Sequence, residues 1–308
     1  MDALIQSLVQ SNFAPDRIVP QASMAQYTTL RIGGPAEVMV NIHSADEIAV
    51  ALRAAKQADA PVTIIGNGSN LLVRDGGIRG LVLRISGGLN AIRREGDCLL
   101  VQAGASLAAV AAFARNEGLS GMAELGGIPG TVGGGVFMNA GAYDGEMAQV
   151  IDWVDCLDET GAAHRLGKDE LKLGYRTSVF SQLPWSIVGA HLTLATGDET
   201  AIREKMADLA QRRRSKQPLE YPSAGSTFKR PVGHFAGGLI EQCGLKGTKV
   251  GGAQVSEKHA GFVINAGGAT CRDILALIRL VRATVLEQTG VTLEPEVRLL
   301  GCALDEES

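Results

Sequence analysis

The chain has 308 residues, of which 45% are hydrophobic and 20% charged, and its formal net charge is −4. This composition is typical of a soluble globular protein with two or three domains, and its mild acidity argues against nucleic acid as a main partner. No apolar run reaches the roughly 18 residues of a membrane span, and the acidic second residue is unlike a secretory leader, so we expect a cytoplasmic protein.

Residues 1–85 alternate helices and strands and predict a small βαβ unit. The helix over 44–58 begins with Ser44 followed three residues later by Glu47, which is the pattern of a capping box. The other expected elements of this block are a short amphipathic helix near the N-terminus and strands at 36–42, 61–66 and 81–85.

The rest of the chain divides into two further α+β blocks, 86–198 and 199–308. In the first we expect a helix over 106–118, capped by Ser106, and a hairpin that turns at 159–161. The remaining expected elements are strands at 98–105, 185–196 and 296–304, and helices over 199–218, 237–244 and 271–290. Together the three blocks predict an α+β protein.

The cysteines and histidines do not form a recognisable framework. The five cysteines are odd in number, widely spaced and without a CxxC pair, so they are interpreted as buried thiols in a reducing compartment. The five histidines are equally scattered, with no HxxxH or HExxH pattern. We therefore predict no metal site.

Two glycine-rich segments stand out. Residues 124–146 contain eight glycines among interleaved apolar residues, which excludes a flexible linker and leaves tight turns or close backbone approach to a ligand. The loop 66–70, Gly-Asn-Gly-Ser-Asn, follows a buried strand and could cradle an anion. It is not a Rossmann fingerprint, because Leu71 occupies the third glycine position, and it is not a P-loop. Alone, this loop is equally well explained as a cluster of turns.

Two such loops from adjacent blocks could clasp a long ligand with a diphosphate, and a dinucleotide is the natural size. The candidate cofactor-binding residues in these loops are Gly66, Asn67, Gly68, Ser69, Asn70, Gly127, Ile128, Gly130, Thr131, Gly133, Asn139 and Gly141.

Seven segments between residues 28 and 301 identify a family. They are TTLRIGGPA, IIGNGSNLLV, ELGGIPGTVGGGVFMNAGAYDGE, LGYRTSVF, AGSTFKRP, KHAGFVINAG and LEPEVRLLG, in this order. The chain closely resembles the UDP-N-acetylenolpyruvoylglucosamine reductases, also called UDP-N-acetylmuramate dehydrogenases, of the shorter, second subclass. The resemblance implies a two-subdomain FAD-binding fold of the vanillyl-alcohol-oxidase (PCMH) type with non-covalent FAD, in subdomains 1–85 and 86–198, and a substrate-binding α+β domain over 199–308.

The resemblance also implies a reaction. NADPH would reduce FAD, and the hydride would pass to the enolpyruvyl ether of UDP-N-acetylglucosamine-enolpyruvate, giving the peptidoglycan precursor UDP-N-acetylmuramate. Arg176 would bind the substrate carboxylate, Glu296 would stabilise the enolic intermediate and Ser226 would donate the proton. The implied substrate contacts are Tyr175, Lys216, Lys229 and Arg230. For Lys216, a purely structural role beside Arg212, Arg213 and Arg214 at a helix C-terminus is the alternative.

Two other functions remain open at this point. The first is an oxidase of the same flavin superfamily, which often tethers FAD through a histidine, although neither glycine loop contains one. The second is a flavin-binding protein without turnover. Neither the residues nor the resemblance indicates a protein partner, and the expected partner is the small-molecule substrate.

Overall fold

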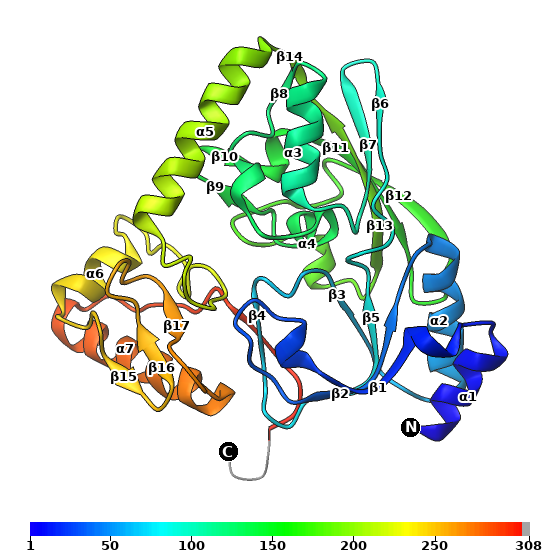
Figure 1. The fold of residues 1–308 in the computed structure, drawn as a ribbon, viewed down its shortest axis with the longest axis horizontal. Coiled ribbons are helices and arrows are strands. Elements are labelled where there is room, and N and C mark those ends of the chain that lie inside the picture. Colours follow the sequence, from blue (N-terminus) through cyan, green and yellow to red (C-terminus); the bar gives the residue numbers. More distant parts are fainter. Residues whose placement is uncertain (304–308) are drawn as a thin grey trace. The chain divides into compact units, whose positions relative to one another are not determined.

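The computed structural model describes residues 1–303, and the chain forms two compact units (Figure 1). Unit 1 consists of Met1–Pro20, Val38–Asn67 and Gly80–Arg213, and unit 2 consists of Gln21–Glu37, Gly68–Arg79 and the chain from Arg214 onward. Each unit has a hydrophobic core of its own. The mixture of helices and strands agrees with the predicted α+β class, and the division into 1–85, 86–198 and 199–308 stays a prediction.

Unit 1 holds most of the regular structure. Four of the elements given below, β1 (Ile18–Ser23), β2 (Pro35–Asn41), β5 (Ile78–Arg84) and α5 (Glu199–Lys216), continue from one unit into the other along the chain. Its helices are α1 (Asp2–Gln10), α2 (Ala45–Gln57), α3 (Leu107–Asn116), α4 (Val132–Phe137) and α5 (Glu199–Lys216). Its strands are β1 (Ile18–Ser23), β2 (Pro35–Asn41), β3 (Val62–Ile65), β5 (Ile78–Arg84), β6 (Ile92–Glu95), β7 (Cys98–Gln102), β8 (Leu119–Ser120), β9 (Gly141–Ala142), β10 (Gly145–Glu146), β11 (Ile151–Leu157), β12 (Ala163–Gly167), β13 (Ser186–Thr193) and β14 (Ala195–Thr196).

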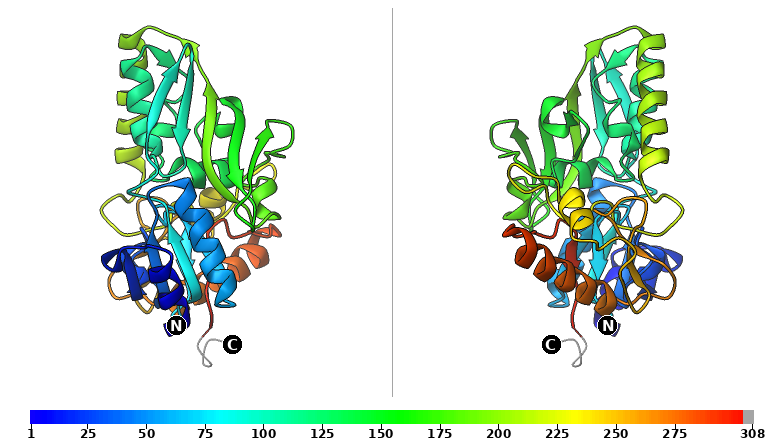
Figure 2. Two further views of the ribbon diagram at one scale, coloured as in Figure 1. Left: turned by 90° about the vertical axis from the view of Figure 1, so that its right-hand side faces the viewer. Right: turned by 90° about the vertical axis from the view of Figure 1, so that its left-hand side faces the viewer.

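Two sheets form the framework of this unit. A five-stranded sheet has the order β12-β11-β13-β7-β6, and its neighbouring strands are antiparallel (Figure 2). The hairpin predicted around residues 159–161 is confirmed as the β11–β12 pair. A four-stranded sheet has the order β1-β2-β5-β3, in which β3 and β5 are parallel, and helix α2 connects β2 to β3 along the chain.

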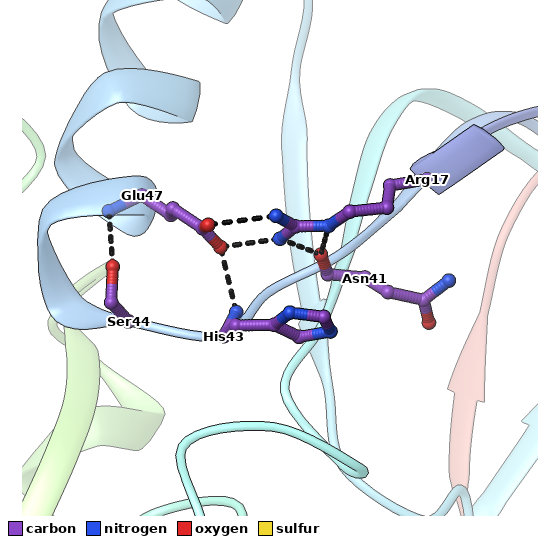
Figure 3. A network of polar contacts seen from close by, with 5 residues as sticks. All are labelled: Arg17, Asn41, His43, Ser44 and Glu47. Carbon is purple, nitrogen blue, oxygen red and sulfur yellow. Dashed lines mark hydrogen bonds and ion pairs between the residues drawn. The ribbon is translucent and has the colours of Figure 1, made fainter. Parts of the chain in front are cut away.

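The start of α2 differs in one detail from the expected capping box (Figure 3). The Ser44 hydroxyl accepts a hydrogen bond from the Glu47 backbone N–H at 3.2 Å, as predicted. The Glu47 carboxylate, however, accepts from the His43 N–H at 2.7 Å and forms a two-pronged ion pair with Arg17. Arg17 also donates to the Asn41 carbonyl, so one guanidinium links the N-terminal segment, β2 and α2. The hydrogen bond from the Arg17 side chain is the main cause that lowers the pKa of Glu47.

The glycine stretch contains a helix that the sequence did not suggest. Thr131 caps α4 by accepting a hydrogen bond from the Gly134 N–H at 3.3 Å. Glycine is unfavourable inside a helix, but here its lack of a side chain allows close packing. A Cβ atom on Gly133 would lie 3.1 Å from the Ala103 Cβ and 3.2 Å from the Ile85 Cδ1. Tertiary packing thus outweighs the poor helix propensity of this segment.

Unit 2 is a smaller α+β assembly, with helices and strands at α6 (Ala236–Gln242), α7 (Cys271–Thr289), β4 (Leu71–Val73), β15 (Lys249–Val250), β16 (Ala253–Val255), β17 (Val263–Asn265) and β18 (Arg298–Leu300). Helix α7, orange-red in Figures 1 and 2, begins at a capping box of Thr270 and Asp273 and ends at Gly290 with φ 72°. The predicted final strand over 296–304 is shorter in the structure, as β18, and position 304 lies outside the described residues.

Two expectations from composition can be compared with the described residues. All five cysteines are free thiols; Cys156 and Cys271 are buried as predicted, while the other three are half-buried. Burial raises the pKa of the Cys156 thiol to about 11, which keeps it protonated and unreactive. Within residues 1–303 no helix has the length and apolarity to cross a lipid bilayer.

Candidate active site

The two predicted glycine loops touch each other inside unit 1. A Cβ atom on Gly66 would overlap the Oγ1 of Thr131, so Gly66 must be glycine for the loops to pack. The Asn67 side-chain amide donates to the Pro129 carbonyl at 3.1 Å, and the Ser86 hydroxyl donates to the Gly66 carbonyl at 3.2 Å. The structure therefore brings Gly66 and Asn67 together with the 129–131 segment, as the clasp hypothesis requires.

The glycines of this region have different roles. Gly133 is buried, and its missing side chain is explained by contact with Ala103 and Ile85 rather than by a ligand. Gly141 is likewise required by the chain, because its Cβ atom would lie 2.8 Å from the Gly145 carbonyl oxygen in the β9–β10 hairpin. Gly134 is exposed, and the nearest atom to its Cβ position is Thr131 Oγ1 at an ordinary 3.5 Å. A ligand can approach the backbone at Gly134.

Asn139 and its neighbours hold the turn that carries Arg176. The Asn139 amide donates to the Gly174 carbonyl at 3.1 Å, and its oxygen accepts from the Ala148 N–H at 2.8 Å. The Arg176 guanidinium donates to the Gly141 carbonyl at 2.9 Å and lies 5.1 Å from the centre of the Tyr175 ring. Arg176, the predicted carboxylate ligand, is thus fixed to the glycine stretch. The side-chain amide of Asn139, which was predicted to bind the cofactor, is largely occupied by its hydrogen bonds to Gly174 and Ala148.

Arg176 itself has an unusual backbone. Its φ of 56° lies in the left-handed region, which non-glycine residues rarely adopt. The turn is held from both sides, by a bridge between Gly174 and Thr177 and by the Ser178 hydroxyl, which donates to the Phe137 carbonyl at 2.8 Å. A strained conformation held in this way is typical of functional positions.

Ser226 and Glu296, the other two predicted catalytic residues, lie on adjacent segments of unit 2. The Glu296 N–H donates to the carbonyl of Thr227 at 2.8 Å, one residue after Ser226. Thr227 is buried and anchored in turn, because its hydroxyl accepts from the Val263 N–H at 2.9 Å. Ser226 itself is exposed and follows Gly225, whose φ is 74°. The sequence separates the two residues by 70 positions, and the backbone hydrogen bond brings their segments together.

The second half of the Gly66–Asn70 loop belongs to unit 2 and meets the Glu296 segment. The Asn70 side-chain amide donates to the Glu296 carbonyl at 3.3 Å, and the Asn70 carbonyl accepts from the Arg298 N–H at 2.9 Å. Strands β4 and β18 continue this contact as a parallel pair. Gly68, with φ 64°, is required by the chain, since a Cβ atom there would overlap the Tyr27 carbonyl oxygen.

The predicted substrate-binding residues of unit 2 are polar and accessible. Lys229 forms an ion pair with Glu294 at 3.2 Å, and the Arg230 guanidinium lies 4.1 Å from the centre of the Phe235 ring. Lys216 is exposed at the end of α5, and no described residue forms an ion pair with it.

His259, for which the sequence offered no role, lies close to this basic region. Its Nδ1 accepts a hydrogen bond from the Gly261 N–H at 3.1 Å, which places the proton of the neutral ring on Nε2. Burial, with smaller contributions from the positive charges of Lys246 and Lys216, lowers the pKa of His259. His259 lies in the segment KHAGFVINAG, which helped to identify the family, but only the tertiary structure associates it with Lys216.

Comparison with known proteins places these features in a family. Residues 36–167 match the model of the FAD binding domain, and residues 217–300 match that of the C-terminal domain of UDP-N-acetylenolpyruvoylglucosamine reductase. Proteins with that reductase name are similar over nearly the whole chain. The one from Clostridium perfringens is 48% identical, covering 92% of this chain and 93% of its own, and the one from Pediococcus pentosaceus is 46% identical, covering 97% and 99%.

Solved structures agree with the sequence matches. The crystal structure of the reductase from Thermus caldophilus superimposes with a TM-score of 0.78 and 36% identity, covering 92% of this chain and 97% of that one. A glucose dehydrogenase, Phl p 4.0202, shares the fold alone, with a TM-score of 0.51 and 12% identity over 94% of this chain. The α+β FAD-binding fold and FAD as the cofactor are thereby confirmed, and the chain belongs to the UDP-N-acetylenolpyruvoylglucosamine reductase family.

Proposed function

We propose that this protein reduces the enolpyruvyl ether of UDP-N-acetylglucosamine-enolpyruvate to UDP-N-acetylmuramate, with FAD as cofactor and NADPH as reductant. The observation that carries the proposal is the pairing of the Ser226 and Glu296 segments through the Thr227–Glu296 backbone hydrogen bond of 2.8 Å. Full-length similarity to reductases of this name supports it. The proposed site of action is the cytoplasm, where nucleotide-linked precursors are made.

The reaction makes two demands on the protein. Hydride addition to the vinyl carbon leaves negative charge on the adjacent carbon and its carboxylate, and that carbon must then receive a proton. In this proposal Arg176 binds the carboxylate through its planar guanidinium. Ser226 donates the proton, and Glu296, in its protonated form, donates a hydrogen bond to the enolic intermediate. The Arg176 guanidinium is held by the Gly141 carbonyl, and Glu296 is held by its backbone N–H. These contacts support the proposed roles, because electrostatic stabilisation depends on fixed positions.

The flavin site is proposed on the side of the glycine loops that faces solvent. Gly134 offers backbone that no described side chain covers, and Gly66 and Thr131 hold the two loops together beside it. A cradle that a Cβ atom would fill suits a flat ring or a diphosphate, so the residues present fit FAD. When bound, FAD carries the hydride from NADPH to the substrate. The proposed ligands are the loop residues predicted from the sequence, with two exceptions. Gly68, Gly133 and Gly141 act by permitting the loop geometry, and the side-chain amide of Asn70 is directed to the Glu296 carbonyl.

The substrate diphosphate is proposed to bind at the basic region of unit 2. Lys216 and Lys246 are electrostatically coupled to His259, and the Nε2–H of His259 is a fixed donor. Lys229 and Arg230 are the further candidates from the sequence. Phosphate oxygens accept hydrogen bonds from such a mixed group of ammonium and imidazole donors.

The experiment that tests the function is anaerobic mixing in two steps. The purified, yellow protein should be bleached by NADPH, and its colour should return when UDP-N-acetylglucosamine-enolpyruvate is added without oxygen. An oxidase of the same fold would regain colour only with oxygen, and a non-catalytic flavin protein would not be bleached by NADPH. Failure of the substrate to restore the colour would refute the proposed reaction.

A further inference from the structure

One face of helix α5 runs along the glycine stretch of unit 1. Lys205, Leu209 and Arg213 are spaced four residues apart and therefore lie on the same side of the helix. Lys205 forms an ion pair with Glu124 at 2.5 Å, and the Leu209 carbonyl accepts a hydrogen bond from the Tyr143 hydroxyl at 3.2 Å. These contacts attach α5 to both ends of the stretch.

The third residue of this face, Arg213, reaches Gly127. A Cβ atom on Gly127 would lie 3.1 Å from an Arg213 guanidinium nitrogen and 3.6 Å from its Cδ. Gly127 is exposed, so the guanidinium lies at the edge of the loop surface that a ligand can reach. A side chain at Gly127 would crowd this position.

Among the described residues, Arg213 has no counter-ion, in contrast to Arg212. Arg212 pairs with Asp208 at 2.8 Å, whereas within residues 1–303 no hydrogen bond or ion pair reaches the Arg213 guanidinium. The side chain is nevertheless half-buried, and burial lowers its pKa. Withdrawing a cation from water without a partner is unfavourable, so this position needs an anion that residues 1–303 do not supply.

We propose that Arg213 binds a phosphate of the FAD pyrophosphate at the edge of the glycine loop. The inference rests on the flavin site proposed above and assigns a ligand to an arginine that sequence reasoning treated as structural. A guanidinium presents a planar pair of N–H donors that matches phosphate oxygens. The absence of a side chain at Gly127 then has two effects, since it lets the loop backbone approach the ligand and leaves room for the guanidinium.

The test compares flavins with and without phosphate on the full-length chain freed of flavin. The dissociation constants of FAD and riboflavin are measured by quenching of flavin fluorescence for the parent, Arg213→Met, Arg213→Lys and the control Arg212→Met. Arg213→Met should weaken FAD binding by about 10- to 100-fold and leave riboflavin binding unchanged, because a charge-assisted hydrogen bond is lost only with phosphate. Arg213→Lys should recover part of the loss, and Arg212→Met should resemble the parent.

Several outcomes would overturn the proposal. Equal weakening of FAD and riboflavin would mean that Arg213 only supports the loop, and unchanged FAD binding with weakened UDP binding would place the phosphate on the substrate. Should Arg213→Met fold poorly, Arg213→Lys still decides, since losing the planar pair of donors must weaken FAD binding below the parent value while riboflavin binding stays unchanged. A parent that binds no flavin would instead refute the proposed function.

Discussion

The side-chain amide of Asn70 donates a hydrogen bond to the backbone carbonyl of Glu296 at 3.3 Å, across 226 positions of sequence. The same peptide segment is held from its other side, where the Glu296 N–H donates to Thr227. The backbone of Glu296 is therefore held on one side by the loop predicted to bind FAD and on the other by the segment that carries Ser226. This arrangement makes Asn70 a positioning residue for Glu296.

Replacing Asn70 should accordingly impair the second half-reaction. In Asn70→Ala the Glu296 carbonyl loses its donor, and a carboxyl group displaced by a fraction of an ångström acts less effectively on the substrate. We expect kcat to fall by about 10- to 100-fold with little change in KM for NADPH. Stopped-flow absorbance of the flavin resolves the two half-reactions, and reduction by NADPH should keep the parent rate.

The matched control is Asn67→Ala, which removes an amide from the same loop. Asn67 donates to Pro129 in unit 1, so this variant should alter flavin retention rather than the rate of substrate reduction. Asn70→Asp should not restore activity, because a carboxylate oxygen cannot donate to a carbonyl. If Asn70→Ala released flavin but processed substrate normally once reloaded, Asn70 would be a cofactor ligand and the positioning role would be wrong.

Ser226→Ala tests the proton donor. Removing the hydroxyl should leave the flavin content and its bleaching by NADPH unchanged. Return of colour with the enolpyruvyl substrate should slow by about 100- to 10,000-fold, the usual effect of losing a positioned acid. Ser226→Cys should recover part of the rate, since a thiol can also donate a proton. An alanine variant reoxidised by substrate at the parent rate would exclude Ser226 as the acid.

A pair of neighbouring glycines separates ligand contact from chain packing. Gly134→Ala adds a methyl group on the exposed side, where the chain has room, and should weaken flavin binding without lowering the unfolding temperature of the flavin-free protein. Gly133→Ala adds the methyl group against Ala103 and Ile85 and should lower the unfolding temperature with or without flavin, by an amount that corresponds to about 1–3 kcal/mol. Equal behaviour of the two variants in both assays would contradict the assignment.

The Arg17–Glu47 pair predicts a pH dependence of stability. The hydrogen bond from Arg17 lowers the pKa of Glu47 in the folded state below its ordinary value of 4.5. Its contribution is therefore complete well above pH 4.5 and is lost as the pH falls through the folded-state pKa, where the carboxylate takes up a proton. Glu47→Gln should lower the free energy of unfolding at pH 7 by about 1–2 kcal/mol.

The comparison is made by urea unfolding at pH 7 and at about pH 3.5. The difference between the parent and Glu47→Gln should shrink at the acidic pH, because the contribution of the ion pair begins to be lost once the pH falls below the ordinary pKa of 4.5. Asp46→Asn is the control, because Asp46 lies in the same first turn of α2 but is exposed and outside the network in Figure 3. A difference that is the same at both pH values would rule out the ion pair as its cause.

The sequence by itself determined the local structure and the family. Helix starts at Ser44 and Ser106, the helix end at Gly290 and the hairpin near residue 160 follow from short-range rules, because a cap or turn involves residues within a few positions of each other. The ordered segments that identified the family are likewise readable along the chain. Pattern alone did not reveal β6, whose residues Ile92–Glu95 are mostly polar and depend on pairing with β7.

Only the tertiary structure decided which residue serves which contact. The sequence presents Gly66–Asn70 as one loop, yet Asn67 contacts Pro129 in unit 1 whereas Asn70 contacts Glu296 in unit 2. Gly133 and Gly134 are equivalent in the sequence, but Gly133 is buried against Ala103 and Ile85 whereas Gly134 is exposed. Arg212 and Arg213 are adjacent in the sequence, but Arg212 pairs with Asp208 whereas Arg213 lies against Gly127. Residues that contact each other across dozens to hundreds of positions leave no periodic pattern in the sequence. Their contacts arise from tertiary packing rather than from spacing along the chain.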